Sequence, residues 1–151
     1  MLLSLRGVNF RHSEAFVVKA NCLGYNFKSL KDITPYLEPT ASGITSLWAR
    51  TTALKYDCVV TVGYPEKVDI TEKWPASPEY YNSAITVNAD GETIANYRKS
   101  FLYYCDETWA LEGPDGFYDG VIPGLGSVAI GICKWPTYDT RRGYLKILLA
   151  L

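Results

Sequence analysis

Histidine is almost absent from this sequence of 151 residues, and its cysteines form no closely spaced pair. His12 is the only histidine, and no G-x-S-x-G motif accompanies it, so the familiar serine-hydrolase patterns are excluded. The four cysteines form no C-x-x-C pair, and one histidine cannot complete a zinc site of ordinary spacing. We therefore expect no metal and no cofactor, and free thiols that pack as small hydrophobic side chains.

An excess of one charge and long apolar runs are also missing. The 15 Lys and Arg residues against 16 Asp and Glu give a net charge of -1, which offers nucleic acid no basic surface. No apolar run approaches the ~18 residues of a membrane-spanning helix. The first residues lack the basic and apolar segments of a signal peptide. We therefore expect a soluble cytoplasmic protein that binds neither nucleic acid nor membrane.

Apolar residues make up 48% of the chain, which is enough for the core of a single domain. The local patterns alternate between helical and strand periodicity, and this order predicts an α/β domain with its elements layered on a sheet. The predicted elements are a short helix capped by Ser29 and ended by Pro35, a helix over 43–55, buried strands over 57–64 and 128–133, and hairpin strands over 82–88 and 93–98 that flank Asp90-Gly91. A proline-rich loop carrying Pro65 is expected after the first buried strand.

The helix predicted over 43–55 has an apolar stripe, with Ser42 as its expected N-cap. We expect this stripe to face the core while Arg50 and Lys55 reach water. It consists of Ile44, Leu47, Trp48, Thr51 and Leu54. The apolar tail over 145–151 has two interpretations, a loosely docked terminus or a final helix.

Two strand ends carry side chains that could perform chemistry. Lys99 follows the strand 93–98, and Cys133 ends the strand 128–133. Strand ends hold side chains rigidly while their tips stay accessible, and a nearby lysine could activate a thiol and stabilise an oxyanion. The alternatives are a solvated hairpin exit and a buried thiol. A G-x-G-x-x-A match at 124–129 is not taken as a nucleotide site, because Pro123 precedes it and a strand follows.

Five stretches in a specific order resemble the carbon–nitrogen hydrolase (nitrilase) superfamily. They look most like its fungal branch, which deamidates N-terminal asparagine and glutamine of proteins. The stretches are GYNFKSL (24–30), LWARTTAL (47–54), NYRKSFL (96–102), ETWALEGP (107–114) and GIC (131–133). The resemblance therefore covers residues 24–133 of a single partial domain that spans residues 1–151.

This resemblance implies an α-β-β-α sandwich with a Glu-Lys-Cys catalytic set. Cys133 would be the nucleophile, Lys99 would stabilise the oxyanion, and Glu107 would be the second glutamate that positions the lysine. The implied reaction hydrolyses the side-chain carboxamide of an N-terminal Asn or Gln through a Cys thioester. The implied partner is a peptide beginning with Asn or Gln, and a homo-oligomer is possible because family members commonly pair.

The two ends, 1–23 and 134–151, depart from the family. Lys19 stands where the family has its general-base glutamate, and Lys134-Trp135-Pro136 follows the cysteine in place of the family's Met-Asp. We expect an incomplete domain whose ends come from an altered transcript, gene model or allele, which comparison with the genomic neighbourhood tests. We also expect impaired catalysis and low solubility. The alternatives are a non-catalytic fragment that pairs with an intact homologue, and a generic aliphatic amidase or nitrilase.

Overall fold

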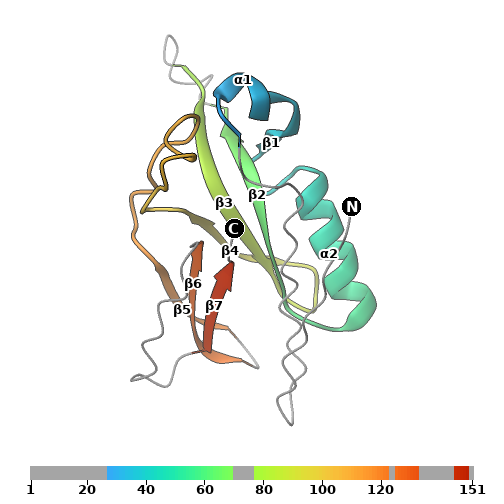
Figure 1. Ribbon diagram of the computed structural model, residues 1–151. Coiled ribbons are helices and arrows are strands. Elements are labelled where there is room, and N and C mark those ends of the chain that lie inside the picture. The colour runs from blue at the N-terminus through green and yellow to red at the C-terminus, as the bar shows by residue number, and fades with distance from the viewer. Residues whose placement is uncertain (1–26, 70–76, 123–124, 133–144, 150–151) are drawn as a thin grey trace.

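The computed structural model describes residues 27–69, 77–122, 125–132 and 145–149, and these form two sheets with helices beside them (Figure 1). The four-stranded sheet has the order β1-β2-β3-β4, and the three-stranded sheet has the order β5-β6-β7. The elements are α1 (Leu30–Ile33), a 3-10 turn η1 (Thr34–Tyr36), β1 (Glu38–Pro39), α2 (Ile44–Tyr56), β2 (Val60–Val68), β3 (Glu79–Val87), β4 (Thr93–Arg98), β5 (Tyr118–Ile122), β6 (Gly126–Ile132) and β7 (Leu145–Leu149). None of the described helices is long and apolar enough to cross a membrane.

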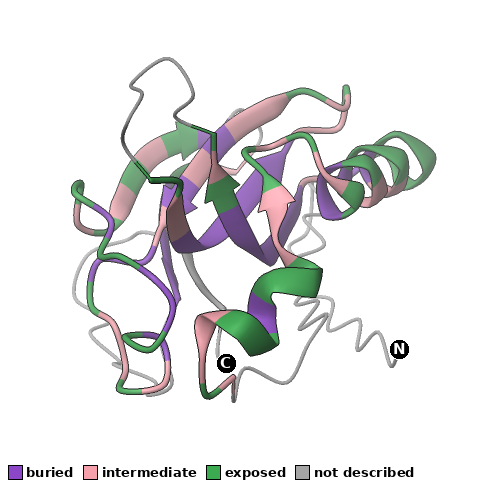
Figure 2. Cartoon of the chain, turned by 90° about the horizontal axis from the view of Figure 1, so that it is seen from above, coloured by how far each residue is buried: buried purple, intermediate pink, exposed green. Residues whose placement is uncertain are grey.

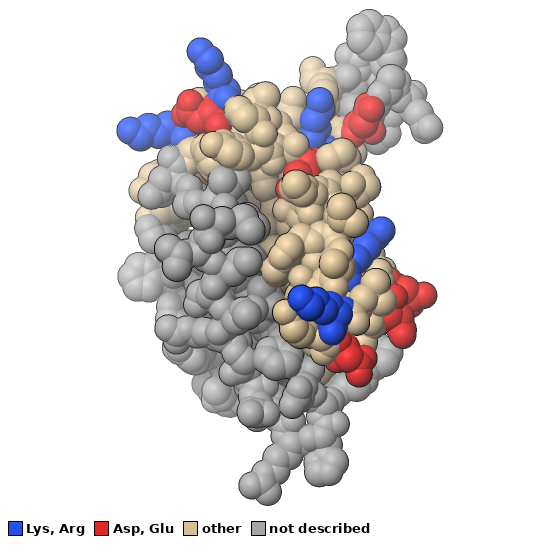
Figure 3. Space-filling view, turned by 90° about the vertical axis from the view of Figure 1, so that its right-hand side faces the viewer, with Lys and Arg blue, Asp and Glu red and all other residues tan. Residues whose placement is uncertain are grey.

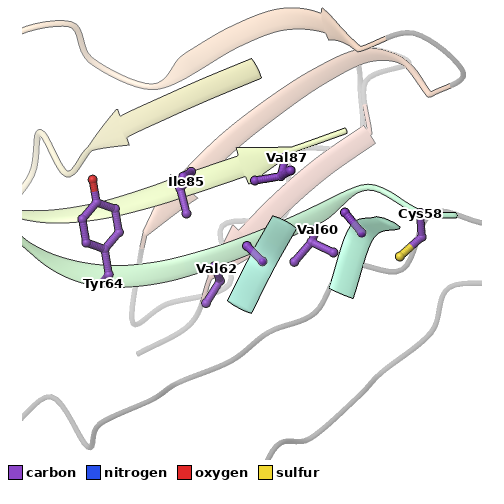
Figure 4. Packing of buried hydrophobic residues seen from close by; sticks show 8 residues of the cluster. Cys58, Val60, Val62, Tyr64, Ile85 and Val87 are labelled. Carbon is purple, nitrogen blue, oxygen red and sulfur yellow. The ribbon is translucent and has the colours of Figure 1, made fainter. Parts of the chain in front are cut away.

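The four-stranded sheet is covered on both faces, because successive side chains of a strand point to opposite sides. On one face α2 packs over a helix-side cluster, shown in Figure 4, that consists of Ala49, Ala53, Cys58, Val60, Val62, Tyr64, Ile85 and Val87. On the other face the second sheet packs over an inter-sheet cluster that consists of Ala84, Ala95, Tyr97, Ile122, Val128, Ile130 and Ile132. This helix–sheet–sheet layering confirms the predicted α/β class and makes up part of an α-β-β-α sandwich.

The predicted hairpin of β3 and β4 is confirmed. Gly91 adopts a φ of 78°, which glycine reaches without steric cost. Asn88 closes the turn twice, since its backbone N–H donates to the Glu92 carbonyl at 2.9 Å and its side-chain oxygen accepts from the Glu92 N–H at 2.8 Å. Because the turn chemistry is local, the sequence is sufficient to predict this hairpin. The register of its strands shifts between Thr86 and Val87, beside the turn.

The position of α2 along the chain is as predicted, and Trp48 of the predicted stripe packs against the helix-side cluster, but three other large residues of that stripe do not face the core. Ile44, Leu47 and Leu54 are 77%, 66% and 61% exposed, and the outer side of this helix is coloured as exposed in Figure 2. The fully buried residues of the helix are small: Thr45, Ser46, Ala49 and Ala53. Short side chains let the helix axis lie close to β2 and β3, where larger ones would overpack.

The predicted N-cap of α2 is also wrong. Gly43 occupies the cap position with no side chain to offer, and the Glu38 carboxylate caps the helix instead. It accepts from the Thr45 backbone N–H at 2.8 Å and from the Thr45 hydroxyl at 2.6 Å. A Cβ at position 43 would collide with the Glu38 side chain, so this cap requires glycine.

The strand β2 begins and ends later in the chain than the strand predicted over 57–64, and it contains Pro65, which was predicted to lie in a loop. Pro65 pairs with Asn82 of β3, and the Asn82 carbonyl accepts from the Lys99 N–H on the opposite side, at 2.8 Å. Both backbone polar groups of Asn82 therefore point toward β4, and the nitrogen of Pro65 points away from β3. Proline at this position consequently removes no hydrogen bond of the β2–β3 ladder.

Three strands, β1, β5 and β7, were not predicted. β5 contains the weak strand formers Asp119 and Gly120, and it forms by pairing antiparallel with β6. The C-terminal tail is neither a loose terminus nor a helix, since residues 145–149 form β7, which pairs parallel with β6. Its apolar run suits a buried strand as well as a helix, and pairing with a distant strand decides between them.

Candidate active site

Lys99 lies directly after β4, on the face of the large sheet that meets the second sheet. Its backbone N–H donates to the Asn82 carbonyl at 2.8 Å, which extends the β3–β4 ladder by one pair. Alternation along the strand puts its side chain on the same face as Ala95 and Tyr97 of the inter-sheet cluster. The side chain is only 4% exposed, so this ammonium needs a partner within the protein.

Asp106 is that partner. The Lys99 Nζ and Asp106 Oδ2 atoms are 2.6 Å apart, and the aspartate side chain is 1% exposed. Oδ2 also accepts from the backbone N–H of Tyr103 at 3.0 Å, and Oδ1 accepts from Asn82 Nδ2 at 3.0 Å. Both carboxylate oxygens are therefore satisfied, as a buried ion pair requires to be tolerated.

The loop that carries Asp106 is held against the large sheet by two backbone hydrogen bonds. The Leu111 N–H donates to the Tyr80 carbonyl and the Gly113 N–H to the Lys99 carbonyl, each at 2.8 Å. A Cβ at position 113 would overlap the carbonyl oxygen of Arg98, so only glycine allows this approach. Trp109 and Ala110 are buried against Ile33 of α1. These contacts hold Asp106 in place relative to the end of β4.

A second buried carboxylate lies on the opposite face of the same sheet. Glu66 of β2 is fully buried and accepts two hydrogen bonds from the Arg98 guanidinium, at 2.8 and 3.0 Å. Ser83 and Thr40 donate hydroxyl hydrogen bonds to it as well. Burial favours a raised pKa of Glu66, but the hydrogen bonds from Arg98, Ser83 and Thr40 outweigh it and hold the pKa below its ordinary value. This pair fixes Arg98, the residue before Lys99.

Of the predicted site residues, Lys99 is placed most clearly. Glu107 is exposed, and the carboxylate at the Lys99 ammonium is that of its neighbour Asp106. Cys133 lies outside the described residues, as do Lys19 and Glu14; the residue before Cys133, Ile132, is buried in the inter-sheet cluster with Tyr97. Sequence reasoning missed Asp106, because two adjacent acidic residues in a loop give no periodicity that tells which one turns inward.

Comparison with known proteins places this site in a family. The family model described as carbon-nitrogen hydrolase matches residues 20–150, a range that includes Lys99, Asp106 and Cys133. The chain belongs to the carbon–nitrogen hydrolase family. The sequence resemblance to that family is thereby confirmed. Lys19 lies just before the matched range.

The similar members of this family are N-terminal amidases. The protein N-terminal amidase of Saccharomyces cerevisiae is 40% identical over 95 residues, which cover 62% of this chain and 19% of the yeast protein. That of Schizosaccharomyces pombe is 32% identical over 141 residues, which cover 87% of this chain and 48% of that protein. This carbon–nitrogen hydrolase chain therefore spans less than half the length of each of these relatives.

Solved structures show the same relationship in three dimensions. A crystal structure of an N-terminal amidase with an Asn-Glu-Ala peptide matches with a TM-score of 0.63 at 31% identity, over 73% of this chain and 28% of that chain. A structure with a Gln-Val peptide matches with a TM-score of 0.62 at 31% identity, over the same shares of the two chains. The described sheets thus correspond to a part of the N-terminal amidase fold.

Proposed function

We propose that this chain carries the lysine and cysteine of an amidase that hydrolyses the side-chain carboxamide of N-terminal Asn or Gln. The observation that carries the proposal is the buried, paired Lys99 at the end of β4, in a chain whose relatives are N-terminal amidases. A buried ammonium held in fixed geometry can stabilise a developing oxyanion without reorganisation. The substrate class comes from the relatives, two of whose structures contain peptides that begin with Asn or Gln.

In the proposed reaction the Cys133 sulfur attacks the carboxamide carbon, and Lys99 stabilises the negative oxygen of the tetrahedral intermediate. The thiol proton passes through a general base to the leaving nitrogen, and the C–N bond breaks to release ammonia. Water then attacks the thioester, which gives the carboxylate and restores the thiol. The role that the family resemblance gives to Glu107 stays a prediction, and Glu107→Gln tests it.

The general base is the missing component of this proposal. Lys19 stands where the family resemblance places the base, and an ammonium cannot accept the thiol proton. General acid–base groups contribute ~10²–10⁴ in rate, so we expect slow turnover by the chain as it stands. Replacing Lys19 with Glu supplies an acceptor at that position.

Ammonia release from a peptide that begins with Asn tests the proposal. We expect weak release by the unaltered chain, an increase on the order of 10²-fold or more in Lys19→Glu, and loss in Cys133→Ala in either background. A peptide that begins with Asp has no carboxamide and controls for other sources of ammonia. Release that persists in Cys133→Ala contradicts the proposed nucleophile.

Two alternatives have distinct outcomes in the same experiments. A generic aliphatic amidase would release ammonia from a small amide as readily as from the peptide. A non-catalytic fragment would show no turnover even as Lys19→Glu and would co-purify with an intact homologue. The cytoplasmic location and the homo-oligomer implied by the sequence stay predictions.

A further inference from the structure

We propose that the exposed side of α2 docks on the outer face of the β5–β6 pair of a second copy of this chain. The contact is head-to-tail, because it joins two different surfaces. Within one copy α2 and the second sheet lie on opposite faces of the four-stranded sheet, so a copy cannot make this contact with itself (Figure 1). The contact does not depend on the proposed function.

The first surface is an apolar stripe along the outer side of α2. It consists of Ile44, Leu47, Thr51 and Leu54, all of which are exposed. Their spacing of three, four and three residues places them in one row along the helix, like the contact row of a coiled coil. A helix that has apolar residues on its outer side as well as toward its own sheet is typically covered on both sides. We therefore expect another layer to pack on this stripe.

The second surface is the outer face of β5 and β6. Asp119 pairs with Ala129, and Val121 pairs with Ser127. Paired residues share a face, and alternation along β6 turns these four side chains away from Val128 in the inter-sheet cluster. Asp119, Ser127 and Val121 are exposed, Val121 to 75%, so no helix of the described residues covers this face.

The two surfaces match in shape and in length. Ser127 and Ala129 are small, which leaves a shallow face on which the large side chains Leu47 and Leu54 can pack. Such pairing of large with small side chains gives close packing between layers. The stripe from residue 44 to residue 54 is about 15 Å long at the helical rise, and a five-residue strand such as β5 is about 17 Å long.

The charges of the two surfaces are opposite. Arg50 and Lys55 flank the stripe on its two sides, and neither forms an ion pair among the described residues. The segment 39–56 contains no Asp or Glu, whereas the segment 100–133 contains five of them and no Lys or Arg. Asp119 lies on the sheet face itself. Two α2 helices packed together would bring like charges into contact, so charge favours the sheet face as the partner of α2.

A head-to-tail contact of this kind does not close on itself at two copies. Each pair retains one free stripe and one free sheet face, so further copies can add at both ends. One helix on a two-stranded face is at the small end of protein interfaces, and we therefore expect weak association that increases with protein concentration.

Two variants, each blocked on one surface, test the contact by sedimentation velocity. Leu47→Gln/Leu54→Gln removes the apolar side chains of the stripe. Asp119→Lys/Val121→Gln changes the charge and the apolar side chain of the sheet face. Each variant alone is expected to associate more weakly than the unaltered chain, on the order of tenfold or more. An equimolar mixture of the two is expected to form a 1:1 dimer and nothing larger, because only one intact stripe and one intact face remain between them.

Other modes of association give different results, and each overturns the proposal. Pairing of two α2 helices would be lost in the stripe variant and kept in the sheet variant. Nonspecific association would persist in both variants and would be weakened equally by Tyr104→Gln, a control that is 66% exposed and lies outside both surfaces. A mixture that stays monomeric, or an unaltered chain that is monomeric at every concentration, also overturns it.

A charge exchange keeps the test valid if the sheet variant does not fold. Arg50→Glu/Lys55→Glu changes only exposed positions of α2, and it is expected to weaken association of the otherwise unaltered chain. Mixing it with Asp119→Lys places opposite charges across the contact again and is expected to restore association. Association that is unchanged by Arg50→Glu/Lys55→Glu overturns the proposed complementarity. Because no turnover is measured, the outcome is independent of the ammonia-release experiments.

Discussion

Glu66 shows how strongly a single residue is constrained in this sheet. A carboxylate with no exposure pays a large desolvation cost, and several donors must converge on it to keep it ionised. Arg98 does so in the two-pronged geometry that matches a carboxylate, and its guanidinium also stacks over the Tyr81 ring at 4.3 Å. The pair therefore joins β2, β3 and β4 at the end of the sheet that carries Lys99.

Replacing Glu66 with Gln is expected to destabilise the chain and to remove part of its acid sensitivity. Breaking a buried ion pair costs about 3–5 kcal/mol, and the partial exposure of Arg98 favours the lower end. Since the folded pKa of Glu66 is depressed below the ordinary 4.5, its stabilisation is complete above that value and is lost as the pH falls through the folded pKa. Urea unfolding at a series of pH values measures both effects.

The control for that experiment is Glu112→Gln, because Glu112 is exposed. It should change the free energy of unfolding by less than about 0.5 kcal/mol. Equal acid sensitivity of the Glu66→Gln variant and the unaltered chain would show that other carboxyl groups govern acid unfolding.

At the scale of elements, α2 separates what periodicity can predict from what it cannot. The 3.6-residue pattern correctly located a helix near residues 43–55, yet of its large apolar residues Trp48 packs against the helix-side cluster, while the three aliphatic ones are exposed. The fully buried residues of α2 are Ala, Ser and Thr, whose short side chains bring the helix close to β2 and β3. Hydrophobicity alone cannot reveal this distance between helix and sheet.

Two substitutions on neighbouring positions of α2 test this orientation. Ala53→Leu is expected to cost about 1–3 kcal/mol, because it forces extra methylene groups into the helix-side cluster. Leu54→Gln, on the exposed side, is expected to change stability by less than about 0.5 kcal/mol. Thermal unfolding of both variants measures the difference. A large loss in Leu54→Gln would place that side chain in an interface.

The other elements divide in the same way: some are determined by contacts between residues close in sequence, and others by contacts between distant residues. The Ser29 cap and the Asp90-Gly91 hairpin were predictable because their hydrogen bonds join residues close in sequence. β5 and β7 were not, since their strand conformation depends on pairing with β6. Asp106 belongs to the second group, because packing of its turn against α1 selects it over Glu107. The roles proposed for Lys99 and Cys133 rest on family resemblance, which carries distant information that local patterns lack.

At the scale of the whole molecule, the described residues bury three clusters but leave much apolar surface in water. Ile44, Leu47, Tyr56, Phe101, Tyr104 and Val121 are among the large exposed hydrophobic residues. Figure 3 shows that, on the side viewed there, charged side chains of both signs are scattered around a largely uncharged area. Interspersed charge of low net value gives little repulsion between molecules. Contacts between exposed apolar surfaces therefore favour self-association.

We expect the isolated chain to associate and to unfold over a broad temperature range. Sedimentation velocity across a series of protein concentrations measures association, and calorimetry at the same concentrations measures the transition. The double variant Leu47→Gln/Leu54→Gln is the matched test, because it removes exposed apolar area from α2 without touching any of the three buried clusters. It should shift the distribution toward monomer. A sharp, reversible transition in a monomer of the unaltered chain would show that the three buried clusters suffice for cooperative folding.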